Sequence, residues 1–457
     1  MKTKNCFVMV ALAAATLLAS CNDDEKNRPV AATGVELNAS TLSLLVGTDT
    51  VLTATVLPLD AADARVDWTS SDPEIASVDA GKVSALKAGG PVAITATTND
   101  GGFEATCNVT VTLPPETFVA PEDVAVSTVC GNVLIGTANG ALDVARFAVP
   151  YAIAVASPDL IFVGDNLNHR VQKIDVPGNN VSTLAGPPPA SMFLMAPAGY
   201  ANATGGDARF SNPIALALDA AGNLYAADNE NCAIRKITQA GVVTTFAGGE
   251  PKEPGFADAA GAAARFNEPS GIAVDKDGYV YVADGKNYRV RKISPAGVVT
   301  TLAGSGAQGA ADGAGSDAQF QELHGLEVDA EGNVYVADDS RVRKISPAGV
   351  VTTLAGGTEK GYAEGVGTAA RFDVIMDVAI DAEGYLYATD LGNNCIRRIT
   401  PSGVVTTLAG TGSAGTANGL GTEAMFNDPG GIDIDASGTL FIVEMSSNRV
   451  RKITFNN

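Results

Sequence analysis

Three carboxylates stand at positions of a repeated strand where most other copies of that strand carry small, uncharged residues. Glu327 and Asp433 take the place of an alanine, and Asp377 takes the place of a glycine or alanine. A buried carboxylate needs a cation, a ligand or an arginine, because an uncompensated charge is costly away from water. Carboxylate oxygens are also the ligands that calcium prefers. These residues predict either a calcium or ligand site or, as we expect from the abundance of arginine in the repeat, structural ion pairs.

A second set of residues lies just before the first strand of each copy, at a position where the type of residue changes from copy to copy. A position that is identical in every copy serves the scaffold, whereas a variable position is free to serve a ligand. We therefore expect the variable side chains to line the mouth of a binding site. They include Tyr151, Ser270, His324 and Met376.

The chain offers little else for catalysis. Its two histidines are His169, which we expect to be solvated, and His324, so a site with three histidine ligands cannot be built. The sequence has no Gly-x-Ser-x-Gly motif, Walker loop or Cys/His pair. The formal net charge of −21 repels phosphate backbones and argues against a nucleic-acid partner. Binding is therefore favoured over catalysis.

The candidate residues belong to a unit that recurs roughly every 54 residues. Its clearest copy spans residues 266–304 and reads FNEPSGIAVDKDGYVYVADGKNYRVRKISPAGVVTTLAG. This pattern predicts four short strands per copy, joined by the turns DKDG and SPAG. The aspartate that ends the second strand recurs in all copies but the last, which has Glu444, so we expect it to be structural and to bind loop amides or a nearby arginine.

The repeat resembles the NHL family in its aliphatic first strand, its Asp-x-x-Gly turn, its YVAD-like strand and its Asn-x-Arg motif. The resemblance implies a six-bladed β-propeller over residues 122–457. The last copy lacks a fourth strand, while residues 123–131 read like that strand with no blade before them. We expect this segment to complete the last blade and close the ring, which would remove the open edges.

A second module precedes the repeats. Apolar and polar residues alternate over residues 33–112, as they do in β-strands. This segment contains Trp68-Thr69-Ser70 and, a few residues later, Ala76-Ser77-Val78-Asp79. This pattern resembles the bacterial Ig-like domain of group 2, which implies a β-sandwich with Trp68 in its core. Residues 113–121 contain three prolines and predict a semi-rigid linker.

The start of the chain resembles a bacterial lipoprotein signal. Lys2 and Lys4 precede an apolar run that is too short to span a bilayer as a helix, and small residues precede Cys21. The resemblance implies that residues 1–20 are removed and that Cys21 is lipidated. Residues 21–32 predict a flexible acidic tether that resembles the export signal of Bacteroidota surface lipoproteins. We therefore expect an outer-membrane protein anchored by lipid and exposed at the cell surface.

Together these patterns predict an all-β, monomeric protein with an Ig-like sandwich and a six-bladed propeller closed by an N-terminal strand. The favoured function is binding of a glycan or protein ligand at the propeller's top face. The aromatic content of 6% weakens the glycan option, since sugars usually stack on such rings. Two alternatives stay open: a metal-dependent hydrolase or lyase of the lactonase-like propeller group, with calcium as the candidate cofactor, and a structural envelope protein.

Overall fold

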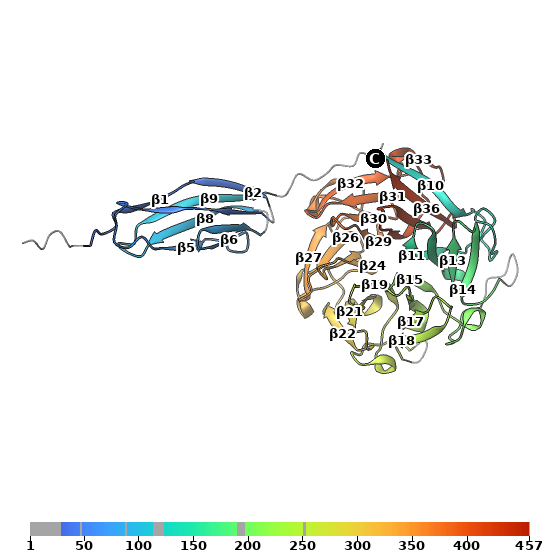
Figure 1. The fold of residues 1–457 in the computed structure, drawn as a ribbon. Helices are drawn as coiled ribbons and strands as arrows, with labels where there is room; N and C mark the ends of the chain where they lie inside the picture. The colour runs from blue at the N-terminus through green and yellow to red at the C-terminus, as the bar shows by residue number, and fades with distance from the viewer. Residues whose placement is uncertain are drawn as a thin grey trace, which may run out of the picture. The chain divides into compact units, whose positions relative to one another are not determined.

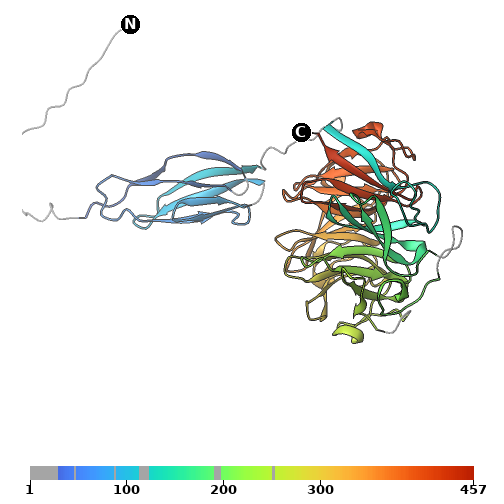
Figure 2. The ribbon, with the colours of Figure 1, turned by 45° about the vertical axis from the view of Figure 1, so that its right-hand side comes forward.

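A computed structural model describes residues 29–45, 48–86, 89–112, 123–189, 197–249 and 253–456. The predicted signal peptide, Cys21, most of the tether and the linker lie outside these residues. The chain divides into two compact units, Met1–Glu116 and Thr117–Asn457. Figures 1 and 2 show that both units are built from strands. Among the described residues, no helix is long and apolar enough to cross a membrane.

The first unit is a sandwich of short strands, as the sequence predicts. Its core contains Leu52, Val83, Ile94 and Val109, and Trp68 packs against this core while remaining partly exposed. One sheet has the order β2 (Thr41–Leu45), β9 (Glu104–Thr112), β8 (Gly89–Thr98) and β5 (Val66–Ser70). The other pairings join β1 (Gly34–Leu37) to β4 (Ala54–Leu57), and order β3 (Asp49–Val51), β7 (Lys82–Ala85) and β6 (Ala76–Asp79).

The second unit is a ring of sheets, which we call blades and number in chain order. The described residues form six of them. The innermost strand of each blade is named first. The first blade contains β11 (Pro150–Ser157), β12 (Leu160–Asp165), β13 (Arg170–Asp175) and β14 (Asn180–Ala185), and the second contains β15 (Pro213–Leu218), β16 (Leu224–Asp228), β17 (Ala233–Ile237) and β18 (Val243–Ala247). The third blade contains β19 (Pro269–Val274), β20 (Val280–Asp284), β21 (Arg289–Ile293) and β22 (Val299–Ala303).

The last three blades add a short strand at the outer edge. The fourth blade contains β24 (Leu323–Val328), β25 (Val334–Asp338), β26 (Arg341–Ile345), β27 (Val350–Ala355) and the short β23 (Gly313–Ala314). The fifth contains β29 (Ile375–Ile380), β30 (Leu386–Asp390), β31 (Cys395–Ile399), β32 (Val404–Ala409) and the short β28 (Gly365–Val366). The sixth contains β34 (Pro429–Ile434), β35 (Leu440–Glu444), β36 (Arg449–Phe455), β10 (Val124–Gly131) and the short β33 (Gly419–Leu420).

The ring closes as the sequence predicts. Strand β10 pairs antiparallel with β36, with Val124 opposite Phe455 and Gly131 opposite Arg449. Figure 1 shows β10, drawn in cyan, beside the red strands from the other end of the chain. The innermost strand of the sixth blade, β34, also contacts that of the first, β11. Strands from the two ends of the repeat region thus complete one blade.

Apolar side chains fill the spaces between neighbouring blades. Tyr225 and Ile234 of the second blade pack with Phe266, Ile272 and Val280 of the third. The second strand of each blade is buried on both faces, which explains its continuous apolar sequence. A buried phenylalanine precedes the innermost strand in every blade: Phe147, Phe210, Phe266, Phe320, Phe372 and Phe426.

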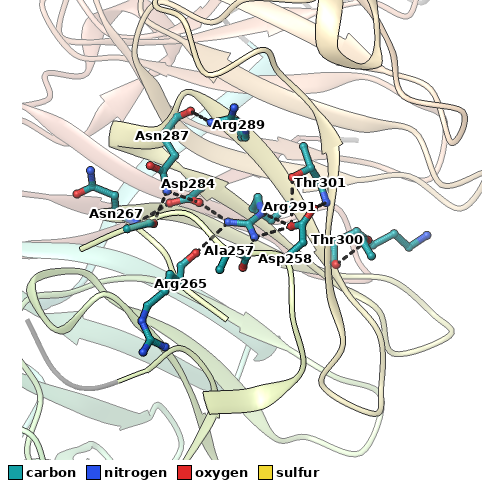
Figure 3. Close-up of polar contacts among 12 residues, drawn as sticks. Ala257, Asp258, Arg265, Asn267, Asp284, Asn287, Arg289, Arg291, Thr300 and Thr301 are labelled. Atoms are coloured by element: carbon teal, nitrogen blue, oxygen red, sulfur yellow. Dashed lines mark hydrogen bonds and ion pairs between the residues drawn. The ribbon is translucent and has the colours of Figure 1, made fainter. Parts of the chain in front are cut away.

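A buried ion pair recurs in each blade and confirms the structural role predicted for the acid at the end of the second strand. In the third blade, Asp284 and Arg291 are both fully buried with their charged atoms 2.6 Å apart. Asp284 also accepts a hydrogen bond from the backbone amide of Asn267 at 2.7 Å. Arg291 donates to the backbone carbonyls of Ala257 and Arg265 (Figure 3). The pair therefore ties the third strand to the loop that enters the blade.

Candidate functional site: a cavity on the axis of the ring

The innermost strands of all the blades surround a cavity of about 210 Å³. Equivalent strands run in the same direction around the ring, so residues near the strand starts share one end of the cavity. Tyr151, Ser270 and Met376 line that end, together with Ile214. Three of the four predicted mouth residues are thus brought together.

The fourth predicted mouth residue, His324, does not line the cavity. Its ring is largely buried, and in the described part of the chain its Nε2 atom has no hydrogen-bond partner. Burial lowers the pKa of His324, so the imidazole is neutral near pH 7. The expectation of a solvated His169 is also wrong, because this side chain is half-buried and its Nδ1 accepts a hydrogen bond from the Asn212 amide.

All three predicted carboxylates line the axial cavity. Asp433 accepts hydrogen bonds from the amides of Val155 and Ile434, both at 2.7 Å. Asp377 accepts from the amides of Ile432 at 3.1 Å and Val378 at 2.9 Å. Glu327 accepts at Oε1 from the Val328 amide at 2.8 Å, and its Oε2 has no donor among the described residues.

The expectation that arginines pair with these carboxylates is wrong. Among the described residues no ion pair involves Glu327, Asp377 or Asp433, and no basic side chain lines the cavity. Their partners are backbone amides, which the sequence analysis missed. The sequence could have indicated these amide partners through the position of the innermost strand. A strand that borders the axis has one edge without a neighbouring strand, so its backbone amides on that edge are free to bind carboxylates.

Burial raises the pKa of each cavity carboxyl. The pKa of Glu327 rises to about 8, through desolvation and the negative charges of Asp433 and Asp377. The pKa of Asp377 rises to about 7 and that of Asp433 to about 6, also mainly through burial, although amide hydrogen bonds oppose the rise. The cavity can thus hold one or more protons near neutral pH.

The hydroxyl of Tyr151 adds a neutral polar group at the mouth. Burial and the charge of Asp377 raise the pKa of Tyr151 to about 12, so the phenol stays protonated. Within the described residues this hydroxyl makes no hydrogen bond. Ser270, by contrast, donates to the backbone carbonyl of Leu323 at 2.7 Å and is held in place.

The geometry does not favour the calcium alternative. In the ranges that the structure describes, no three His, Cys, Asp or Glu side chains are grouped so that they could hold a metal ion. Glu327, Asp377 and Asp433 line one cavity, but their oxygens already accept amide protons from Val328, from Val378 and Ile432, and from Val155 and Ile434. The arrangement suits hydrogen-bond donors entering the cavity better than one shared cation.

Comparison with known proteins agrees with both modules. Residues 31–109 match the family described as bacterial Ig-like domain (group 2), and residues 252–321 match the Teneurin NHL domain. NHL repeat-containing protein 2 of Bos taurus is 29% identical over 334 residues, which cover 64% of this chain and 44% of that protein. Protein SUPPRESSOR OF QUENCHING 1, chloroplastic, of Arabidopsis thaliana is 28% identical over 56% of this chain and 26% of its own length. The chain therefore spans less than half of these relatives.

Solved structures similar to this chain include two that each cover 94% of it. One is a structural genomics protein of unknown function from Bacteroides thetaiotaomicron, with a TM-score of 0.56, 19% identity and 98% of its chain covered. The other is described as an auxiliary nutrient binding protein of the same organism, with a TM-score of 0.55, 18% identity and 99% covered. At these identities the likeness shows the fold alone.

Fold and comparisons together define an all-β protein with an Ig-like sandwich followed by a propeller. The first module is a bacterial Ig-like domain of group 2, and the second is an NHL-repeat propeller with six blades in the described residues.

Proposed function

We propose that this is a binding protein whose propeller receives, in its axial cavity, a group that donates hydrogen bonds. The observation that carries the proposal is the lining of the cavity: Glu327, Asp377 and Asp433 supply acceptors, and no basic side chain among the described residues neutralises them. A ligand with hydroxyl or ammonium donors complements such a surface, whereas an anion is repelled by it.

The size of the cavity limits what enters it. At about 210 Å³ it is smaller than the roughly 300–1,000 Å³ of pockets that enclose a whole small ligand. One sugar ring at the end of a glycan, or one side chain of a protein ligand, is the matching unit, and the rest of the ligand would lie across the face around the mouth. Tyr151 offers its hydroxyl to such a group as donor or acceptor.

The cellular setting in this proposal is the bacterial surface. The signal-like start and Cys21 support a lipid anchor, and the name of the similar auxiliary nutrient binding protein agrees with a binding role. Cys21→Ala should release the protein from the membrane fraction or leave it unprocessed, and full membrane retention of this variant would contradict a lipid anchor. The hydrolase or lyase alternative lacks a metal cluster in the described chain, and no particular contact supports a purely structural role.

A substitution that narrows the mouth of the axial cavity tests the binding proposal. Tyrosine already occupies the Ser270 position in the first blade, as Tyr151, so Ser270→Tyr should be accepted by the strand while it fills the entrance. Thermal shift against neutral sugars, amino sugars and lysine, followed by a glycan array, should find a ligand for the full chain. Ser270→Tyr should abolish the response, and Thr300→Tyr on the exposed outer strand should keep it. A ligand that binds Ser270→Tyr as well as the wild type would contradict axial binding.

A further inference from the structure

A second cavity, of about 370 Å³, lies where the outer part of the fourth blade meets the loop that leads into the fifth. Arg341 and Arg371 line it, together with Thr353, Thr368, Gly357 and Glu359. It shares no lining residue with the axial cavity. Its arginines give it the chemistry that the acidic axial cavity lacks.

Arg341 is a buried cation without a partner. The residue is 5% exposed, and among the described residues it makes no hydrogen bond and no ion pair. Its Nε atom is fully buried. A guanidinium stays charged at any physiological pH, and burying a charge without compensation is costly. Arg341 therefore differs from the paired arginines of the blades, because its charge has no compensating group among the described residues.

The same position in other blades shows how such an arginine is normally satisfied. Arg170 pairs with Asp165 at 2.9 Å. Arg289 donates to the carbonyls of Asn287 and Ser305 and lies over the ring of Phe256, 4.0 Å from its centroid. The second and fifth blades avoid the charge altogether, with Ala233 and Cys395.

Two local changes in the fourth blade remove these partners. Two residues separate Asp338 from Arg341, whereas four separate Asp284 from Arg289. The shortened loop therefore has no counterpart of Asn287. In addition, Ala310 stands ten positions before Phe320, where the third blade has Phe256 ten positions before Phe266. Arg341 thus lacks the aromatic contact that Phe256 gives to Arg289, although Arg343 keeps its contact with Phe320.

The remaining walls suit an oxyanion. Arg371 lies at the rim, where it forms an exposed ion pair with Glu359 at 2.7 Å. The exposed fractions of the two side chains are 50% and 73%, so solvent weakens this pair and a stronger anion can replace Glu359. Thr368 adds a hydroxyl, whereas the Thr353 hydroxyl already donates to Asp312 at 3.0 Å. Ser340 donates to the carbonyl of Gly357 at 2.8 Å, which holds the glycine segment against the shortened loop.

We propose that this cavity is a binding site for a small oxyanion of the carboxylate or phosphate type, held by Arg341 with Arg371 at its entrance. The planar guanidinium presents paired N–H donors that match the two oxygens of such a group. The overall charge of −21 opposes anions at a distance, so binding depends on these local donors. The site is independent of the ligand proposed for the axis.

Calorimetric titration of the full chain at constant ionic strength tests the site, with inorganic phosphate, glucuronate and chloride as separate probes. Phosphate or glucuronate should bind saturably with one site per chain, and the stronger of the two identifies the class of anion. Chloride should give no saturable signal. Arg341→Gln should weaken binding about tenfold or more, since hydrogen bonds to charged groups are strong. Glu359→Gln should strengthen it, because a competing carboxylate is removed.

Matched arginines in the neighbouring blade provide the controls. Arg289 occupies the position of the repeat that Arg341 occupies in the fourth blade, and Arg265 occupies the position equivalent to that of Arg371. Arg289→Gln and Arg265→Gln should both leave the affinity for the anion unchanged. Melting without anion gives a second readout. Arg341→Met should not lower the melting temperature, because a charge without a partner is removed, whereas Arg289→Met should lower it. Absence of saturable binding by phosphate and glucuronate, or equal destabilisation by the two methionine variants, would overturn the proposal.

Discussion

The carboxylate of Asp433 accepts a hydrogen bond from the backbone amide of Val155, 2.7 Å away, across the junction where the sixth blade meets the first. Asp377 does the same one junction earlier, where it accepts from the Ile432 amide. Each carboxylate therefore satisfies the free inner edge of the next blade. The same oxygens border the axial cavity, so stability of the ring and affinity for a ligand depend on shared atoms.

This double role decides which substitutions can test the cavity. Asp433→Ala removes the acceptors of two part-buried amides, those of Val155 and Ile434, which costs about 1–3 kcal/mol for each amide that water does not reach. Asp433→Asn keeps a carbonyl oxygen for one of the two amides and removes the charge, but its NH2 group then faces the other amide as a second donor. Glu327→Gln keeps an oxygen for its single partner, the Val328 amide, so this variant separates loss of charge from loss of structure more cleanly.

The pH dependence of stability should report on Glu327. Its pKa is raised to about 8 from an ordinary value of 4.5, so folding favours the protonated form. This contribution to stability is complete below about pH 4.5 and is lost as the pH rises through about 8. Glu327→Gln stays neutral and should be more stable than the wild type at pH 9 by about 1–3 kcal/mol, with little difference at pH 4.

Urea unfolding of the propeller at pH 4 to 9 measures this effect. Glu331→Gln, which removes an exposed carboxylate from the next turn of the same blade, should follow the wild-type curve. Parallel curves for Glu327→Gln and the wild type over the whole range would show that Glu327 is not buried as a protonated group.

The buried pair of Asp284 and Arg291 should behave as one unit. Arg291→Met leaves Asp284 buried without its cation and should destabilise the propeller by about 3–5 kcal/mol. Adding Asp284→Asn should recover part of this loss, because the stranded charge is removed. Losses that simply add in the double variant, measured by chemical unfolding, would mean that the two side chains are not coupled.

Closure of the ring by β10 predicts a sharp effect of truncation. A chain that starts at Ala120 retains the propeller with its complete sixth blade and should melt cooperatively. A chain that starts at Asn132 lacks β10, exposes the edge of β36, and should aggregate or melt at a much lower temperature. Equal melting temperatures for the two chains would contradict closure by this strand.

The sequence predicts the blades and their closure because repetition marks every equivalent position. Positions that vary between the copies of the innermost strand also identify six residues that line one cavity: Tyr151, Ser270, Met376, Glu327, Asp377 and Asp433. The placement of His324 fails because a position in a strand does not determine which way a bulky ring turns. The two residues missing before Arg341 were the available signal for the second cavity.

The arginine partners expected for the carboxylates fail for a geometric reason. Glu327 lies on β24 and Arg343 on β26, with β25 between them. Glu327 is level with Tyr335 and Lys344, whereas Arg343 is level with Val336 and Leu326, so the side chains of Glu327 and Arg343 point to opposite faces of the blade. Arg343 instead pairs with Asp338 at 2.6 Å. Asp377 and Asp433 accept from amides of the next blade, and Glu327 accepts from the Val328 amide of its own strand. Those contacts join residues as far apart as Asp433 and Val155, which only the closed ring brings together.

Melting curves of the wild type and of the double variant Glu327→Gln with Asp433→Asn test the central claim most directly. They should be recorded at pH 7 with neutral sugars, amino sugars, lysine and calcium added one at a time. We expect a saturable rise in the melting temperature of the wild type with a ligand that carries hydrogen-bond donors, by mass action on the folded state. The double variant should stay folded, with a modestly lower melting temperature because one amide loses its acceptor at position 433, and it should lose that rise. A double variant that is strongly destabilised, together with a wild type that responds to none of these ligands, would contradict axial binding.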